Sequence, residues 1–161
     1  MGLHLLLVDD EAAFRAVLRR RLVRRGFTVS EAGGGAEALE RLEGDDTIAV
    51  VLLDLKMPAP DGLATLRAVK ARWPLAPVVL LTGHGTVATA VEAMREGAFD
   101  YLTKPCDLAA LTALVEAAAA HRRHYEALLR EARTRPYITR REREARVARI
   151  LEAAQAPRER A

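Results

Sequence analysis

The sequence contains a single cysteine, Cys106, so it cannot form an internal disulfide bond. Aromatic residues make up only 4% of the chain. No apolar run approaches the roughly 20 residues that a membrane-spanning helix requires, and the N-terminus lacks the basic start, apolar core and small-residue cleavage site of a secretion signal. These absences exclude a disulfide scaffold and an integral membrane protein, and together they predict a reducing, cytoplasmic location.

Half of the 161 residues are hydrophobic, and a chain of this length suits one core of ordinary size. The formal net charge of +3 conceals an uneven distribution. Residues 1–120 hold 13 basic residues against 16 acidic ones, whereas residues 121–161 hold 12 arginines against 6 glutamates. The basic character belongs to the end of the chain, so it does not make the whole protein a nucleic-acid binder.

Apolar runs of strand length alternate with segments of helical periodicity over most of the chain. We expect strands at residues 3–8, 27–32, 48–53, 78–81 and 100–103. The spacing of apolar residues predicts helices at residues 11–25, 36–42, 62–72 and 86–96, with a last helix capped by Asp107. Continuous apolar strands joined by crossover helices indicate an α/β fold, with a parallel sheet covered on both faces.

Polar residues follow the expected strands at the end where such sheets bind ligands. Asp9 and Asp10 end the first strand, Asp54 ends the third, Thr82 ends the fourth and Lys104 follows the fifth. The carboxyl ends of parallel strands lie side by side, so these residues should converge. Three carboxylates in one pocket repel one another, and a hard divalent cation such as magnesium would compensate them. A carboxylate nucleophile beside a metal ion and a lysine suits phosphoryl transfer.

Four motifs, "LLLVDDE", "LLDLKMPAPDG", "LLTGHGT" and "AFDYLTKP", follow one another between residues 3 and 120. In their order and spacing they resemble the receiver domain of two-component response regulators. The resemblance implies a flavodoxin-like, doubly wound sheet of five parallel strands in the order 2-1-3-4-5 with five helices. It also implies a phosphorylation-dependent switch, and not a metabolic enzyme, that accepts a phosphoryl group from a histidine kinase with Mg²⁺ and signals through protein–protein contacts.

The resemblance further implies roles for single residues at the acidic end of the sheet. Asp54 would be the phosphoacceptor. Asp9, Asp10, Asp54 and the backbone carbonyl of Lys56 would hold Mg²⁺. Lys104 would pair with the phosphoryl group. On the residues alone, Asp9 and Asp10 also fit the N-cap of the following helix.

Other positions would respond to phosphorylation or tune it. Thr82 would hydrogen-bond the phosphoryl group, and Tyr101 would turn inward as Thr82 moves, although Tyr101 also fits a simple core position. The peptide bond before Pro105 would be cis. Lys56 and His84 stand two residues after Asp54 and Thr82, at positions that tune hydrolysis of the phosphorylated form in this family.

The last part of the chain extends beyond a receiver domain. A heptad pattern predicts that the last receiver helix continues to about residue 130; it comprises Leu111, Leu114, Ala118, His121, Tyr125 and Leu128. Thr139 and Glu142 have the spacing of a capping box, which predicts a second helix over about residues 139–154. We therefore divide the chain into a receiver domain, residues 1–120, and an arginine-rich helical extension, residues 121–161.

Several interpretations of this extension stay open. The heptads fit a homodimer through the extended helix, and they also fit a helix that packs on its own sheet and is then solvated. The arginines could contact DNA, although no further helix follows to complete a helix-turn-helix. The segment "GHGTVATAVEAMREGAFDYLTKP" resembles receivers of enhancer-binding activators, so the chain is a stand-alone receiver or the front of such an activator. A further alternative for the function is a magnesium-dependent phosphatase with a related active site. It is disfavoured because such an enzyme would carry an aspartate at the position of Lys56.

Overall fold

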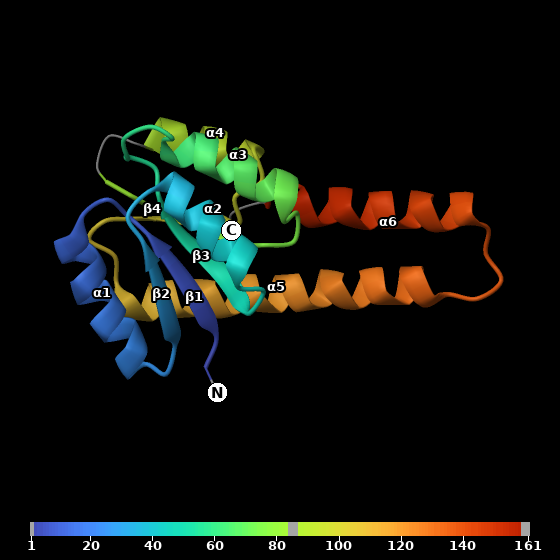
Figure 1. Ribbon diagram of the computed structural model, residues 1–161, viewed down its shortest axis with the longest axis horizontal. Coiled ribbons are helices and arrows are strands. Elements are labelled where there is room, and N and C mark those ends of the chain that lie inside the picture. The colour runs from blue at the N-terminus through green and yellow to red at the C-terminus, as the bar shows by residue number, and fades with distance from the viewer. Residues whose placement is uncertain (1, 84–86, 159–161) are drawn as a thin grey trace.

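The computed structural model describes residues 2–83 and 87–158, in which strands and helices alternate up to the fifth strand (Figure 1). The strands are β1 (His4–Val8), β2 (Thr28–Ala32), β3 (Ile48–Asp54), β4 (Val78–Thr82) and β5 (Asp100–Thr103). The helices are α1 (Ala12–Arg24), α2 (Gly35–Gly44), α3 (Gly62–Arg72), α4 (Val87–Arg95), α5 (Leu108–Thr134) and α6 (Arg140–Gln155). The strands form one parallel sheet in the order β2-β1-β3-β4-β5, which confirms the predicted flavodoxin-like fold.

The strands send apolar side chains to both faces of the sheet. In β1, Leu6 and Val8 join the core cluster beneath α2, α3 and α4, whereas Leu5 and Leu7 join the cluster beneath α1 and α5. Successive residues of a strand point to opposite faces, so a sheet covered by helices on both sides needs a continuous apolar run. Because both faces are covered, the strand ends are where polar residues can gather.

Among the described helices α3 has the expected bounds, α1, α2, α4 and α6 differ from the expectation by one or two residues at an end, and α5 differs most. α1 begins at Ala12, because Glu11 has an extended backbone and precedes the helix. α5 continues to Thr134, past the expected end near residue 130. From Leu108 to Arg135 the chain contains neither proline nor glycine, so the helix ends only where Pro136 approaches.

α5 and α6 form an antiparallel pair that projects from the domain (Figure 1). The capping box at the start of α6 is complete: the Thr139 hydroxyl accepts the Glu142 N–H at 3.1 Å, and the Glu142 carboxylate accepts the Thr139 N–H at 2.7 Å. Leu129 and Ala132 are buried although they lie beyond the sheet. α6 therefore packs on α5 of its own chain, and dimerisation through the extension stays a prediction.

Across the described ranges, 2–83 and 87–158, we find no helix with both the length and the apolar character needed to cross a membrane.

Candidate functional site

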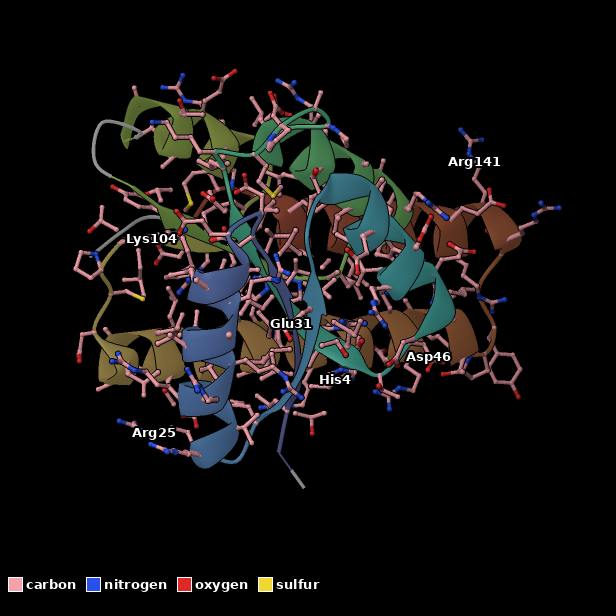
Figure 2. The ribbon with its side chains drawn as sticks, turned by 60° about the vertical axis from the view of Figure 1, so that its left-hand side comes forward. His4, Arg25, Glu31, Asp46, Lys104 and Arg141 are labelled. Atoms are coloured by element: carbon pink, nitrogen blue, oxygen red, sulfur yellow. The ribbon has the colours of Figure 1, made fainter. Side chains whose placement is uncertain are left out.

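The carboxyl ends of the strands bring together side chains that are far apart in sequence. Asp9 follows β1 directly, and Asp54 and Thr82 are the last residues of β3 and β4. Asp9, Asp10 and Asp54 each place one carboxylate oxygen within 4.8 Å of the others, and Asp9 and Asp54 are buried whereas Asp10 is exposed. Lys104 lies at this edge of the sheet, next to the first turn of α1, and His4 marks the opposite end of β1 (Figure 2).

Lys104 supplies positive charge to the buried carboxylates. Its Nζ lies 2.6 Å from Asp9 Oδ2 and 3.6 Å from Asp54 Oδ2. The same ammonium group lies 4.0 Å from the centre of the Phe14 ring, a cation–π contact that holds the side chain over α1. The backbone N–H of Lys104 also donates to the Thr82 carbonyl at 2.6 Å, which ties the end of β5 to the end of β4.

Asp9 makes several hydrogen bonds, but neither Asp9 nor Asp10 caps α1 as the alternative interpretation expected, because the N-cap residue is Glu11 and it has no side-chain cap hydrogen bond. Its Oδ1 accepts the backbone N–H of Glu11 at 2.9 Å, so it supports the start of α1. Its Oδ2 faces Lys104, and its backbone carbonyl accepts a hydrogen bond from Arg15. Because its side chain is buried and both of its carboxylate oxygens have hydrogen-bond partners, Asp9 is a fixed member of the acidic cluster.

The environment of Asp54 favours its protonated form more than water does. Burial raises the pKa of Asp54 above its ordinary value, and the nearby charges of Asp9 and Asp10 act in the same direction. The Lys56 backbone N–H, which donates to Asp54 Oδ1 at 3.1 Å, and the charge of Lys104 oppose this rise in pKa. An added cation would favour the ionised, nucleophilic carboxylate.

Thr82 is fully buried, and within the described residues its hydroxyl has no hydrogen-bond partner. Buried polar groups without partners are rare in proteins and cost free energy. A hydroxyl held in this state at the edge of an acidic cluster suits a ligand oxygen. Three carboxylates are also the hard oxygen ligands that Mg²⁺ prefers. The residues present therefore fit both a magnesium ion and a phosphoryl group.

The remaining expected residues are Tyr101, Pro105, His84 and Lys56. Tyr101 is half-buried and packs against the core cluster beneath α2, α3 and α4. The Lys104–Pro105 peptide bond is cis, and so is Ala59–Pro60, which the sequence analysis did not anticipate. His84 lies outside the described residues. The Lys56 carbonyl as a metal ligand stays a prediction.

Phe14 and Arg15 are site residues that the sequence analysis missed. Phe14 has the helical spacing of the apolar residues of α1, and nothing in this spacing indicates the contact with Lys104. Arg15 donates to the Asp9 carbonyl from one turn further along the chain, and arginines are too common in this helix for one of them to stand out.

Comparisons with known proteins agree with this geometry. Residues 5–116 match the family described as response regulator receiver domain. DNA-binding transcriptional regulator NtrC from Escherichia coli K12 is 45% identical over 115 residues, which are 71% of this chain and 24% of that protein. Transcriptional regulatory protein ZraR from the same strain is 40% identical over 120 residues, 74% of this chain and 27% of that protein. The chain thus spans about a quarter of the length of these curated relatives.

Solved structures show the same fold. A response regulator receiver domain protein from Clostridium thermocellum superposes with a TM-score of 0.73 and 34% identity, covering 77% of this chain and 98% of that one. NtrX from Brucella abortus in complex with ADP superposes with a TM-score of 0.75 and 28% identity, covering 92% of this chain and 33% of that one. The second match extends past the receiver region into the helical extension. Together with the sheet order and the acidic cluster, these matches show that the chain belongs to the response regulator receiver domain family.

Proposed function

We propose that this chain is a phosphorylation-controlled signalling switch with Asp54 as its phosphoacceptor. The observation that carries the proposal is the buried Asp54 carboxylate, grouped with Asp9, Asp10 and Lys104 at the end of the sheet where the buried Thr82 hydroxyl has no partner among the described residues. A carboxylate in such a site can act as a nucleophile toward phosphorus and form an acyl phosphate.

The residues would divide the work of phosphoryl transfer among them. Asp9, Asp10, Asp54 and the Lys56 carbonyl would hold Mg²⁺, which neutralises charge on the transferred oxygens. An Asp54 oxygen would form the new bond to phosphorus, while the bond to the kinase histidine breaks and its electron pair stays on the imidazole. Lys104 would leave Asp9 and pair with a phosphoryl oxygen, and Thr82 would donate its hydroxyl to another.

The new charge on Asp54 would favour a second conformation of the receiver. Movement of Thr82 would let Tyr101 turn inward and reshape the surface formed by α4, β5 and α5, which a downstream protein would recognise. Water would later remove the phosphoryl group, at a rate tuned by Lys56 and His84. The chain would catalyse only its own phosphorylation at Asp54 and the later hydrolysis of the phosphorylated form. Its partner would be a histidine kinase, and both would act in the cytoplasm.

Incubation with acetyl phosphate and Mg²⁺, followed by intact-mass spectrometry, tests this proposal. We expect one phosphoryl group on the wild type and none on Asp54→Asn. Asp61→Asn is the matched control, because Asp61 is an exposed helix cap at the same edge of the sheet and should be labelled like the wild type. Equal labelling of Asp54→Asn, or labelling without divalent cations, would reject the proposal.

A second candidate is the front part of a longer transcription activator. The curated relatives are regulators about four times as long as the matched region, and the NtrX match continues into the extension. Direct DNA contact through the extension is less well supported, because three of its arginines already pair with a glutamate one turn away: Arg122 with Glu126, Arg135 with Glu131 and Arg140 with Glu144. A salt-dependent DNA gel shift of the full chain, lost on removing residues 137–161, would favour DNA contact.

A further inference from the structure

We propose that the carboxyl end of α6 is a latch that docks on the receiver at the edge opposite the acidic cluster, and that phosphorylation of Asp54 releases it. The docking surface, called here the latch site, comprises Lys70, Pro74, Pro77, Gly97, Phe99 and His121. This inference rests on the proposed function, because it needs phosphorylation at Asp54. It adds a regulatory role for α6 that the receiver fold alone does not contain.

The end of α6 and the residues that follow it contact the latch site. Ala154, Ala156 and Arg158 line a cavity with the latch site, and its volume of about 20 Å³ leaves room for about one water molecule. The Arg158 guanidinium carbon lies 3.9 Å from the centre of the Phe99 ring. In Figure 1 the last turns of α6, in red, lie beside the carboxyl end of α3. α6 is therefore packed against the receiver as well as against α5.

Gly97 of the latch site lies next to both Lys70 and the end of α6. A Cβ added at Gly97 would lie 3.5 Å from Lys70 Cε and 3.9 Å from the Gln155 carbonyl oxygen, which are ordinary contact distances. The Lys70 ammonium is itself buried and donates to the carbonyls of Pro74 and Ala76 at 2.9 and 3.0 Å.

Two elements connect the latch site to the acidic cluster. α4 runs from the Thr82 end of the sheet toward Gly97, and its nine residues span about 13 Å as one rigid helix. Phe99 directly precedes β5, and its N–H donates to the Val78 carbonyl at 2.8 Å. At the other end of β5, the Lys104 N–H donates to the Thr82 carbonyl at 2.6 Å. A displacement at Thr82 and Lys104 would therefore reach two residues of the latch site, Gly97 through α4 and Phe99 through β5.

The unphosphorylated receiver is the state on which α6 docks, and this determines the direction of the coupling between docking and phosphorylation. In the structure α6 is docked, and the Lys104 ammonium group lies closer to Asp9 than to Asp54. A phosphoryl group on Asp54 would draw Lys104 and Thr82 toward itself and shift β5 and α4, so the latch site would fit α6 less well. Because linkage is reciprocal, releasing α6 must favour the phosphorylated form by the same factor.

Hydrogen exchange of the backbone amides in residues 150–156, measured on the full chain, tests the latch. A helix of this length is marginal in water without tertiary contacts, so release should accelerate exchange. We expect Mg²⁺ with beryllofluoride, a phosphoryl mimic, to accelerate exchange about tenfold in the wild type and to leave Asp54→Asn unchanged. Ala154→Arg should accelerate exchange without the mimic and should bind the mimic more tightly by a similar factor.

Ala153→Arg is the matched control, because Ala153 is the exposed neighbour of Ala154 on the same helix and receives the same change. Circular dichroism would verify that both variants keep the receiver folded, and Arg158→Ala provides an exposed, milder variant that should accelerate exchange about two- to fivefold. Unchanged exchange in a wild type that binds the mimic would overturn the latch and leave the proposed function intact. A wild type that binds no mimic would instead reject the proposed function.

Discussion

Replacing Lys104 by methionine should destabilise the protein without Mg²⁺ and much less with it. The substitution keeps the length of the side chain and removes the ammonium group that lies 2.6 Å from Asp9 and 3.6 Å from Asp54. Two buried carboxylates, with Asp10 nearby, would then face one another without this compensating charge. The free energy of the folded state therefore rises relative to that of the unfolded chain, in which the carboxylates are hydrated.

The size of the effect follows from the burial of the three partners. Removing one partner of a buried ion pair costs about 3–5 kcal/mol, because it leaves an uncompensated buried charge. The Lys104 side chain is 20% exposed, whereas those of Asp9 and Asp54 are 2% and 8% exposed. Partial access of solvent to the lysine places the expected loss at the lower end of that range, about 3 kcal/mol at pH 7.

Urea denaturation at pH 7 with and without Mg²⁺ measures this loss. We expect Mg²⁺ to restore most of the stability of Lys104→Met, since a cation bound only by the folded protein stabilises it and compensates the carboxylates. Lys56→Met is the control, because Lys56 is exposed at the same edge and its loss should change the free energy of unfolding by less than about 0.5 kcal/mol. Equal losses in the two variants, or a loss at Lys104 that Mg²⁺ does not reduce, would refute this explanation of the acidic cluster.

Three further predictions concern single residues. Thr82→Val should raise the free energy of unfolding by about 1 kcal/mol, since it removes a buried hydroxyl without a partner, and should weaken beryllofluoride binding in a titration. Burial lowers the pKa of Lys70 to about 8 from 10.5. Between pH 8 and pH 10.5 the unfolded chain therefore binds more protons than the folded protein does. The stability of the wild type, relative to Lys70→Met, should then rise by about 3 kcal/mol from pH 8 to 10.5 in urea denaturation, and a fall would contradict the burial argument. Thr139→Ala should cost about 1 kcal/mol by removing the helix cap of α6, seen as faster amide exchange at the start of α6 but not of α5.

The fold and the acidic cluster could be predicted because local patterns specify them. Continuous apolar runs such as β3 need helices on both faces, and the acids at their ends can only meet at one edge of a parallel sheet. The contact between Asp54 and Lys104 follows from this topology alone. The start of α6 was equally accessible, because a capping box is a local pattern and Thr139 and Glu142 form both of its hydrogen bonds.

Other features depend on tertiary contacts that no local pattern specifies. The apolar residues of α6 have helical spacing, but this spacing does not distinguish α5, the receiver or a second chain as the surface they cover. Phe14 looks like an ordinary core residue until Lys104 is placed above its ring. Thr82 carries no sign in the sequence that its hydroxyl would be buried without a partner. The contact of Phe99 with Arg158, which follows α6, likewise appears only in three dimensions.

The most direct test of the central claim is to locate the phosphoryl group. After labelling with acetyl phosphate and Mg²⁺, peptide sequencing by tandem mass spectrometry would identify the modified residue. We expect the phosphoryl group on Asp54, the buried carboxylate 3.6 Å from Lys104. A phosphoryl group on Asp9, Asp10 or a histidine, with Asp54 unmodified, would contradict the account.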